Sequence, residues 1–243
     1  MQEENAIEVR NLHIRYKCLH NMSIRRSLFK LRKNKADVFE AVKGISFDVK
    51  KGEIVGLVGK NGSGKSTTLR AIAGIFSPDE GTIENYTDSL ALLSIGVGFQ
   101  NRLTGRENIY LSGMLLGYPK DKITEKMDEI ISFAEIGDFI DMPVRTYSSG
   151  MFSKLAFSIT AILEPKIMLV DEVLSVGDAK FRKKSGAKMQ ELIKDESRTV
   201  ILVSHNSDTI RKFCDRVIWL HEGDIKMIGP TDEVMPVYDE FMS

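Results

Sequence analysis

The sequence lacks several features that would assign it to a broad class at once. Its 243 residues hold two cysteines, Cys18 and Cys214, too few for a disulfide framework or a multi-thiolate metal site, so a reducing compartment, the cytoplasm, is expected. The 34 basic and 34 acidic side chains cancel, so no overall charge draws the chain to nucleic acid or to an acidic membrane. No apolar run reaches the roughly 18 residues that span a bilayer, and the N-terminus lacks a signal pattern. Internal repeats and heptads are also missing.

The composition is that of a globular chain, with 42% hydrophobic and 28% charged residues, and it is long enough for one large α/β domain or two small ones. In the C-terminal half, apolar runs at 167–170, 199–203 and 217–220 predict strands. Helical periodicity separates them at 180–195 and 208–214. This alternation predicts a sheet with parallel strands.

The N-terminal half begins with a strand at 6–16 whose alternation changes phase near Arg10 and Asn11. Apolar runs at 39–49 and 54–58 flank a turn. Further short strands are expected to end near residue 97, and helical periodicity then extends over about 105–162. We expect that stretch to form a helical subdomain inserted in the α/β core.

A basic insertion occupies about residues 19–38. Between Val9 and Ala36 there are nine Lys or Arg and no Asp or Glu, interleaved with apolar residues, which favours a partly amphipathic helix. Such a segment could contact anionic lipid, a pyrophosphate-bearing lipid-linked glycan or nucleic acid. The alternative is a solvated charged face.

Residues 59–66, GKNGSGKS, follow a predicted strand and open a predicted helix, which is the context of a phosphate-binding loop. Its glycines let backbone N–H groups turn toward phosphate oxygens, and the helix N-terminus adds positive potential. Lys65 is expected to reach the β- and γ-phosphates, and the Ser66 hydroxyl to ligate Mg²⁺. A structural glycine loop is the alternative.

Two carboxylates, Asp171 and Glu172, follow the apolar run at 167–170. A buried strand would deliver them to the carboxyl edge of the sheet, where phosphate binds. We expect Asp171 to hold Mg²⁺ and its water, and Glu172 to orient or deprotonate the water that attacks the γ-phosphate. The alternative is a strand that ends in solvated acids.

These motifs, together with Gln100, the segment YSSGM at 147–151 and His205, stand in the order and approximate spacing of the nucleotide-binding subunits of ABC transporters. The chain resembles that family over nearly its whole length. The resemblance implies one ABC ATPase domain over 1–243, with a P-loop NTPase α/β core, an antiparallel β subdomain and the helical insertion. It also implies ATP and Mg²⁺ as ligands.

The resemblance also assigns roles to single residues. Tyr16 would stack on adenine, Gln100 would touch the metal or the attacking water and sense a membrane subunit, and His205 would contact the γ-phosphate. Each could instead be an ordinary structural residue. The implied nucleotide-binding residues are Tyr16, Gly59, Lys60, Asn61, Gly62, Ser63, Gly64, Lys65, Ser66, Thr67, Ser148, Gly150 and Asp178, with Ser66, Gln100 and Asp171 at the metal and Glu172, His205 and Gln100 in catalysis.

The segment YSSGM departs from the usual LSGGQ of the superfamily. Ser148 keeps the hydroxyl and Gly150 the bare backbone N–H that would contact the γ-phosphate of ATP bound to the other protomer. Asp178 would lie at the interface between the two protomers. Ser148 could also serve as a helix N-cap. Lys154 stands where arginine is common, so an ion pair there would lack bidentate geometry.

YSSGM, the segment after Gln100 and the residues after Glu172 resemble specifically the ATPases that export polysaccharides, O-antigen-type glycans and teichoic acids. The resemblance implies a homodimer on two separate transmembrane subunits at the cytoplasmic face of the membrane. The alternatives are the ATPase of a drug or small-solute transporter and an ATP-dependent nucleic-acid or ribosome factor. Little sequence follows residue 230, so a carbohydrate-recognition domain is not expected in this chain.

Overall fold

The computed structural model describes residues 4–18, 37–87, 89–93, 98–171, 177–195 and 197–242. Glu172 and nearly all of the basic insertion lie outside these residues. No helix among the described residues is long and apolar enough to cross a bilayer.

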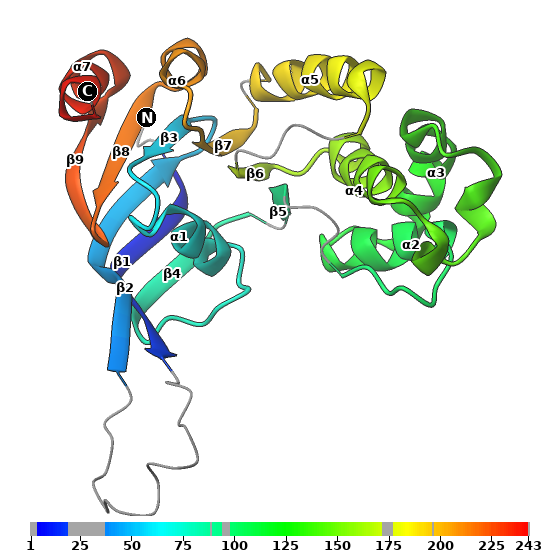
Figure 1. Cartoon of the computed structure of the whole chain (residues 1–243), viewed down its shortest axis with the longest axis horizontal. Helices are drawn as coiled ribbons and strands as arrows, with labels where there is room; N and C mark the ends of the chain where they lie inside the picture. Colours follow the sequence, from blue (N-terminus) through cyan, green and yellow to red (C-terminus); the bar gives the residue numbers. More distant parts are fainter. Residues whose placement is uncertain are drawn as a thin grey trace, which may run out of the picture.

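Two sheets form the centre of the molecule (Figure 1). The three-stranded antiparallel sheet has the order β2-β1-β4, and the six-stranded sheet has the order β5-β6-β7-β3-β8-β9. All pairs in the larger sheet are parallel except β8 with β9. The strands are β1 (Asn5–Cys18), β2 (Asp37–Lys50), β3 (Ile54–Val58), β4 (Glu80–Asn85), β5 (Leu90–Leu93), β6 (Ile167–Asp171), β7 (Thr199–Val203), β8 (Arg216–His221) and β9 (Asp224–Pro230).

The phase change expected in the first strand is confirmed as a bulge in β1. The pairing of β1 with β2 shifts register between Val9 and Leu12, and Asn11 adopts a φ of 46°. The extra residue restores the inward direction of Leu12 and Ile14, both of which are buried.

Helices cover both faces of the larger sheet, because its central strands are apolar on both sides. Alternate residues of β3, β6 and β7 point either toward α1 and the smaller sheet or toward α5, α6 and α7. The helices are α1 (Lys65–Ile72), α2 (Gly105–Leu115), α3 (Lys120–Ala134), α4 (Ser149–Leu163), α5 (Ala179–Ile193), α6 (Ser207–Phe213) and α7 (Thr231–Met242), with short 3-10 helices η2 (Gly137–Asp141) and η3 (Val144–Thr146).

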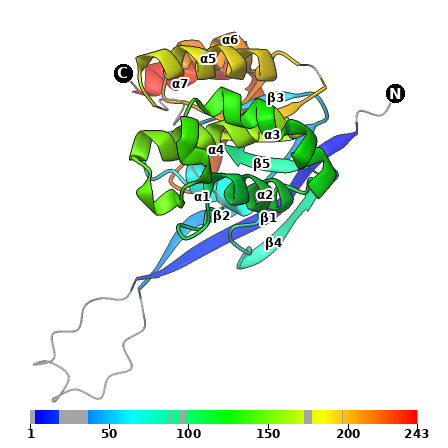
Figure 2. The same ribbon diagram turned by 90° about the vertical axis from the view of Figure 1, so that its right-hand side faces the viewer.

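Helices α2, α3 and α4 gather beside the sheets and share an apolar cluster of their own, which includes Ile109, Ile130 and Leu155. Figure 2 shows this helical unit in front of the sheets, with α5 running alongside α4. The sequence did not lead us to expect β9 or α7, which extend the larger sheet and cover its outer face.

Candidate functional site

The candidate site lies at the carboxyl edge of the larger sheet. Asp171, the last residue of β6, pairs in register with Val203, the last residue of β7, and Val203 also neighbours Leu57 of β3. The glycine loop follows β3, and His205 follows β7. Parallel strands therefore bring the loop, the carboxylate and the imidazole to one place.

An open cavity of about 420 Å³ marks this place. Nine of the predicted site residues line it: Tyr16, Asn61, Gly62, Gly64, Lys65, Ser66, Thr67, Asp171 and His205. These nine residues come from four separate stretches of the chain and surround one hollow. Gly59, Lys60 and Ser63 belong to the same loop.

The glycines of the loop are required by its shape. Gly59 and Gly64 have φ values of 150° and 103°, and a Cβ on them would lie 2.2 Å from the Leu220 carbonyl oxygen and 2.7 Å from that of Ala41. Helix α1 then begins without a side-chain cap and without an acidic residue in its first turn. Its first N–H groups are therefore suited to an anion, so the loop fits a phosphate group.

Lys65 is the buried cation of the site, with 6% of its surface exposed. Its Nζ donates hydrogen bonds to the carbonyl oxygens of Gly59, at 2.7 Å, and Lys60, at 3.0 Å. These bonds hold the ammonium group inside the loop. Its charge therefore acts at the position where the loop N–H groups converge.

The donor set also fits a magnesium ion. The Ser66 hydroxyl and the Asp171 carboxylate line the same cavity, and Mg²⁺ prefers oxygen ligands supplied by one or two protein groups together with phosphates and water. In the described part of the chain no cluster of three His, Cys, Asp or Glu side chains could hold a metal by itself.

The aromatic side of the cavity includes a residue that the sequence did not single out. Tyr16 places its hydroxyl 3.4 Å from Thr67 Oγ1, and Phe39, its register partner on β2, lines the cavity beside it. Phe39 is 55% exposed. Finding it would have required the pairing of β1 with β2, because cross-strand partners point to the same face.

Of the described residues predicted for the site, seven do not line this cavity: Gly59, Lys60 and Ser63, which belong to the glycine loop, and Gln100, Ser148, Gly150 and Asp178, which lie outside it. The backbone N–H of Gln100 donates to Asn108 Oδ1 at 2.7 Å, and the residue is exposed. Ser148 caps α4 by accepting a bond from the Met151 N–H at 3.2 Å, which confirms the N-cap interpretation.

Asp178 forms an ion pair with Lys154, for which the sequence had indicated no particular partner. Lys154 Nζ donates to Asp178 Oδ2 at 2.6 Å, and the lysine side chain is 15% exposed. This hydrogen bond, aided by the Phe181 N–H, lowers the pKa of Asp178 to about 2. The pair joins the start of α4, with Ser148 and Gly150, to the start of α5 within one chain.

Comparisons with known proteins agree with this geometry. Residues 42–175 match the ABC transporter family. The O-antigen export system ATP-binding protein RfbB of Myxococcus xanthus is 43% identical over 86% of this chain and 47% of its own length. The teichoic acids export ATP-binding protein TagH of Lactococcus lactis is 48% identical over 86% of this chain and 44% of its own length. An RfbB protein of Klebsiella pneumoniae is 42% identical over 84% of this chain and 82% of its own length.

Two solved structures share the fold. An ATP-binding subunit of an ABC transporter superposes with a TM-score of 0.71 at 23% identity, covering 96% of this chain and 93% of that one. An ATP-binding cassette dimer bound to ADP and Pi superposes with a TM-score of 0.70 at 21% identity, covering 93% of this chain and 98% of that one. The predicted fold class is thereby confirmed.

A phosphate loop, a carboxylate and an imidazole at the edge of a parallel sheet define the chain as a P-loop α/β protein. The chain belongs to the ABC transporter family, and the family expected from its motifs is confirmed. It spans about half the length of the RfbB and TagH relatives from M. xanthus and L. lactis.

Proposed function

We propose that the chain is the ATP-hydrolysing subunit of an ABC exporter that moves a lipid-linked polysaccharide or a teichoic-acid-type polymer across the cytoplasmic membrane. The observation that supports ATP hydrolysis is the cavity that Lys65, Ser66, Asp171 and His205 line together. The cargo class is supported by similarity to the O-antigen and teichoic acid export proteins.

Different residues of the site would contact different parts of ATP. Tyr16 and Phe39 offer apolar surface to the base, the loop N–H groups and Lys65 bind the phosphates, and His205 approaches the γ-phosphate. Ser66 and Asp171, with Gln100 from its loop, would hold Mg²⁺, which neutralises phosphate charge when bound. Glu172, next to Asp171 in the sequence, would orient or deprotonate the attacking water.

Among the described residues, the phosphate donors that line the cavity come from the glycine loop and from His205, and we assign further contacts with the phosphates to a second copy of the chain. Ser148 and Gly150 of that copy would contact the γ-phosphate, and Asp178 would lie at the seam. Hydrolysis would break this bridge and let the dimer open. Two copies on two separate transmembrane subunits, at the cytoplasmic face of the membrane, would then convert ATP turnover into transport.

The test uses Glu172→Gln. In purified protein with its membrane subunit and Mg²⁺, we expect ATP to bind normally while hydrolysis falls at least about 100-fold, the size of a lost general base. In cells that rely on this chain, the same variant should leave the lipid-linked polymer on the cytoplasmic side.

If Glu172→Gln retained ATP hydrolysis, Glu172 would not be the residue that orients or deprotonates the attacking water. Normal surface polymer together with abolished hydrolysis would contradict the cargo assignment and favour another class of ABC substrate. Glu125→Gln, an exposed glutamate on α3, is the matched control and should leave both measurements unchanged.

A further inference from the structure

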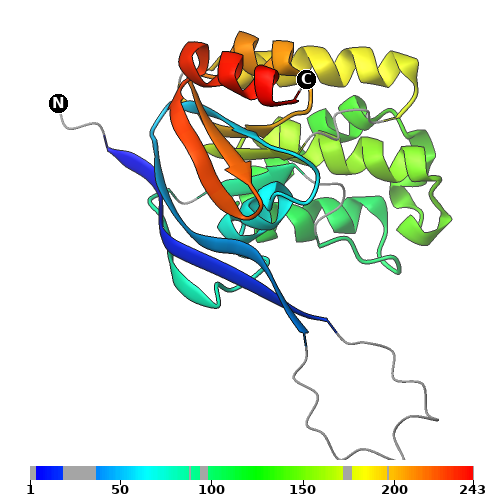
Figure 3. The same ribbon diagram turned by 60° about the vertical axis from the view of Figure 1, so that its left-hand side comes forward.

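The segment that carries Gln100 is attached to the helical unit. The ring of Phe99 packs against Phe152 of α4, with 4.8 Å between the ring centroids. A Cβ on Gly98 would lie 2.2 Å from Cδ1 of Leu115, at the end of α2. Figure 3 shows the green helices of this unit together on the right-hand side of the molecule. The residues just before Gln100 therefore rest on α2 and α4.

Asn108 of α2 holds the backbone of Gln100 itself. Its Oδ1 accepts a hydrogen bond from the Gln100 N–H at 2.7 Å, and its Nδ2 donates one to the Gln100 carbonyl at 3.2 Å. The N–H and the carbonyl belong to the two peptide groups on either side of the Gln100 Cα, so the two bonds fix both backbone dihedrals of this residue. They thereby set the direction in which the Gln100 side chain leaves the backbone.

The same amide group continues into the residues that follow Gln100. Nδ2 of Asn108 also lies within hydrogen-bond distance of the carbonyls of Leu103, at 3.2 Å, and Thr104, at 2.8 Å. Since Nδ2 carries two hydrogens, it shares them among these carbonyls and that of Gln100. The acceptor and donor ends of the amide are thus fixed by their surroundings, and the Asn108 side chain is fully buried.

These bonds exceed what the start of α2 needs. Thr104 and Glu107 already cap the helix, because each side chain accepts a bond from the backbone N–H of the other. The two bonds from Asn108 to Gln100 therefore serve the segment before the helix. Gln100 is exposed while its backbone is held from within, an arrangement that presents its side chain in a limited set of directions.

We propose that Asn108 is a positioning residue that directs the Gln100 side chain toward its ligand. The inference rests on the proposed function, in which Gln100 helps to hold Mg²⁺, and deepens it by naming the residue on which that placement depends. Asn108 itself touches no substrate. Because a small displacement of an active group can cost up to about 100-fold in rate, loss of Asn108 should slow hydrolysis without weakening ATP binding to the intact phosphate loop.

The first measurement is hydrogen exchange of the Gln100 amide in the full chain without nucleotide. In the wild type this amide should exchange at least about tenfold more slowly than in an unfolded peptide of the same sequence. Asn108→Ala removes every side-chain bond and should abolish the protection. Asn108→Asp keeps an acceptor oxygen for the Gln100 N–H but loses the donor, so it should reduce the protection less.

The second measurement is ATP hydrolysis by the complex with the membrane subunit and Mg²⁺. Asn108→Ala should lower kcat at least about tenfold while the KM for ATP stays within about twofold. Added to Gln100→Ala, it should lower kcat no further, because Asn108 acts through Gln100. Ile130→Val, in the buried cluster of the same helical unit, is the control. It should lower the Tm but leave kcat and the Gln100 exchange unchanged.

An unprotected Gln100 amide in the wild type would overturn the inference, and so would an unchanged kcat in a folded Asn108 variant. A further loss of kcat when Asn108→Ala is added to Gln100→Ala would also overturn it, because Asn108 would then act by another route. A Gln100→Ala variant as active as the wild type would leave Asn108 nothing to position and would have the same consequence. Failure of the wild-type complex to hydrolyse ATP would refute the proposed function instead, and amide exchange would still judge whether Asn108 holds Gln100.

Discussion

Lys154 occupies a restricted environment on α4. Its Nζ donates to Asp178 and lies 5.3 Å from the centre of the Phe181 ring, and a Cβ on Gly177, whose φ is 73°, would come within 3.0 Å of its Cε. Glycine at position 177 therefore leaves room for the Lys154 side chain. The ammonium group donates to one carboxylate oxygen of Asp178, without the bidentate geometry of an arginine.

The low pKa of Asp178 predicts a pH dependence of stability. The folded value of about 2 lies below the ordinary 3.8, so the ion pair stabilises the fold fully above about pH 4 and is lost as pH falls toward 2. Asp178→Asn keeps the capping oxygen that accepts the Phe181 N–H but removes the charge. We expect its stability deficit relative to wild type to shrink between pH 4 and 2.

Urea unfolding followed by the fluorescence of Trp219, the one tryptophan of the sequence, measures this difference. Asp138→Asn, at an exposed position in η2, is the control. A deficit that stays constant from pH 7 to pH 2 would show that Asp178 does not gain from the charge of Lys154.

At the scale of elements, α5 holds the helical unit through a row of lysines. Lys180, Lys184 and Lys188 are spaced four residues apart and so share one face. The first two pair with Glu135 at 3.1 and 2.9 Å, and the third with Glu164 at 3.1 Å. These glutamates end α3 and α4 in the left-handed region, with φ of 51° and 57°, where glycine is usually favoured. Their carboxylates connect the unit to α5.

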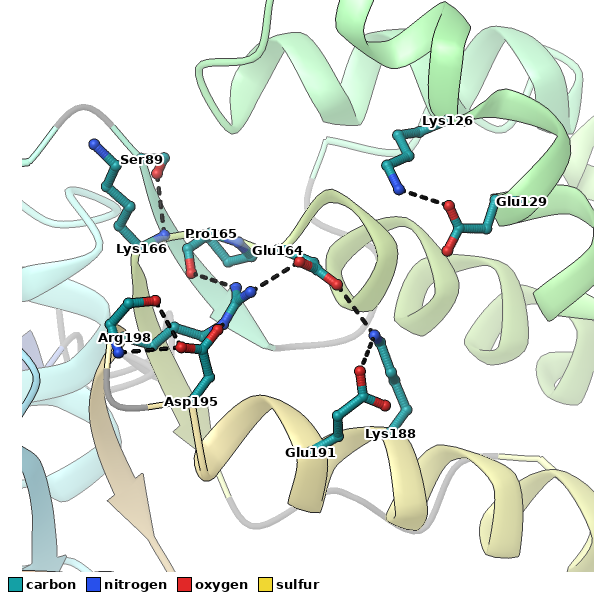
Figure 4. A network of polar contacts seen from close by, with 11 residues as sticks. Ser89, Lys126, Glu129, Glu164, Pro165, Lys166, Lys188, Glu191, Asp195 and Arg198 are labelled. Atoms are coloured by element: carbon teal, nitrogen blue, oxygen red, sulfur yellow. Dashed lines mark hydrogen bonds and ion pairs between the residues drawn. The ribbon is translucent and has the colours of Figure 1, made fainter.

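Glu164 is the centre of this connection, and it also accepts from Arg198 at 2.8 Å, as Figure 4 shows. Arg198 is mostly buried, so removing an acceptor leaves its charge less compensated. Glu164→Ala should lower the free energy of unfolding by about 1 kcal/mol and speed amide exchange at the end of α4.

Glu129→Ala is the matched control, because in the described part of the chain the half-exposed Glu129 side chain pairs with Lys126 of its own helix, at 2.7 Å. Its effect should stay within about 0.5 kcal/mol. Equal effects of the two variants would mean that the row of lysines adds nothing beyond ordinary surface pairs.

The sequence revealed elements where local chemistry was sufficient. A glycine loop between an apolar strand and a helix predicted the phosphate-binding geometry, and acids or histidine after buried strands predicted their position at one edge. Phe39 was not found, because its place depends on strand register. The contact of Lys60 with the Phe241 ring was not found either, because it joins residues about 180 positions apart and α7 carries no motif.

At the scale of the whole molecule, the cavity and the start of α4 are separate features of one chain. Lys65 lines the cavity, whereas Ser148 and Gly150 do not. If both act on one ATP, they act from different copies, and the functional unit has two composite sites related by symmetry. This is the central claim of the proposed mechanism.

Crosswise complementation tests that claim most directly. Lys65→Ala disables the phosphate loop, and Gly150→Glu places charge and bulk at the start of α4, where a Cβ has room because its nearest neighbour is Ser148 Oγ at 3.8 Å. Each variant alone should be inactive. With random pairing of a 1:1 mixture, roughly half of the dimers contain one intact site, so roughly a quarter of the wild-type ATPase rate should return. A mixture no more active than its parts would contradict the composite site.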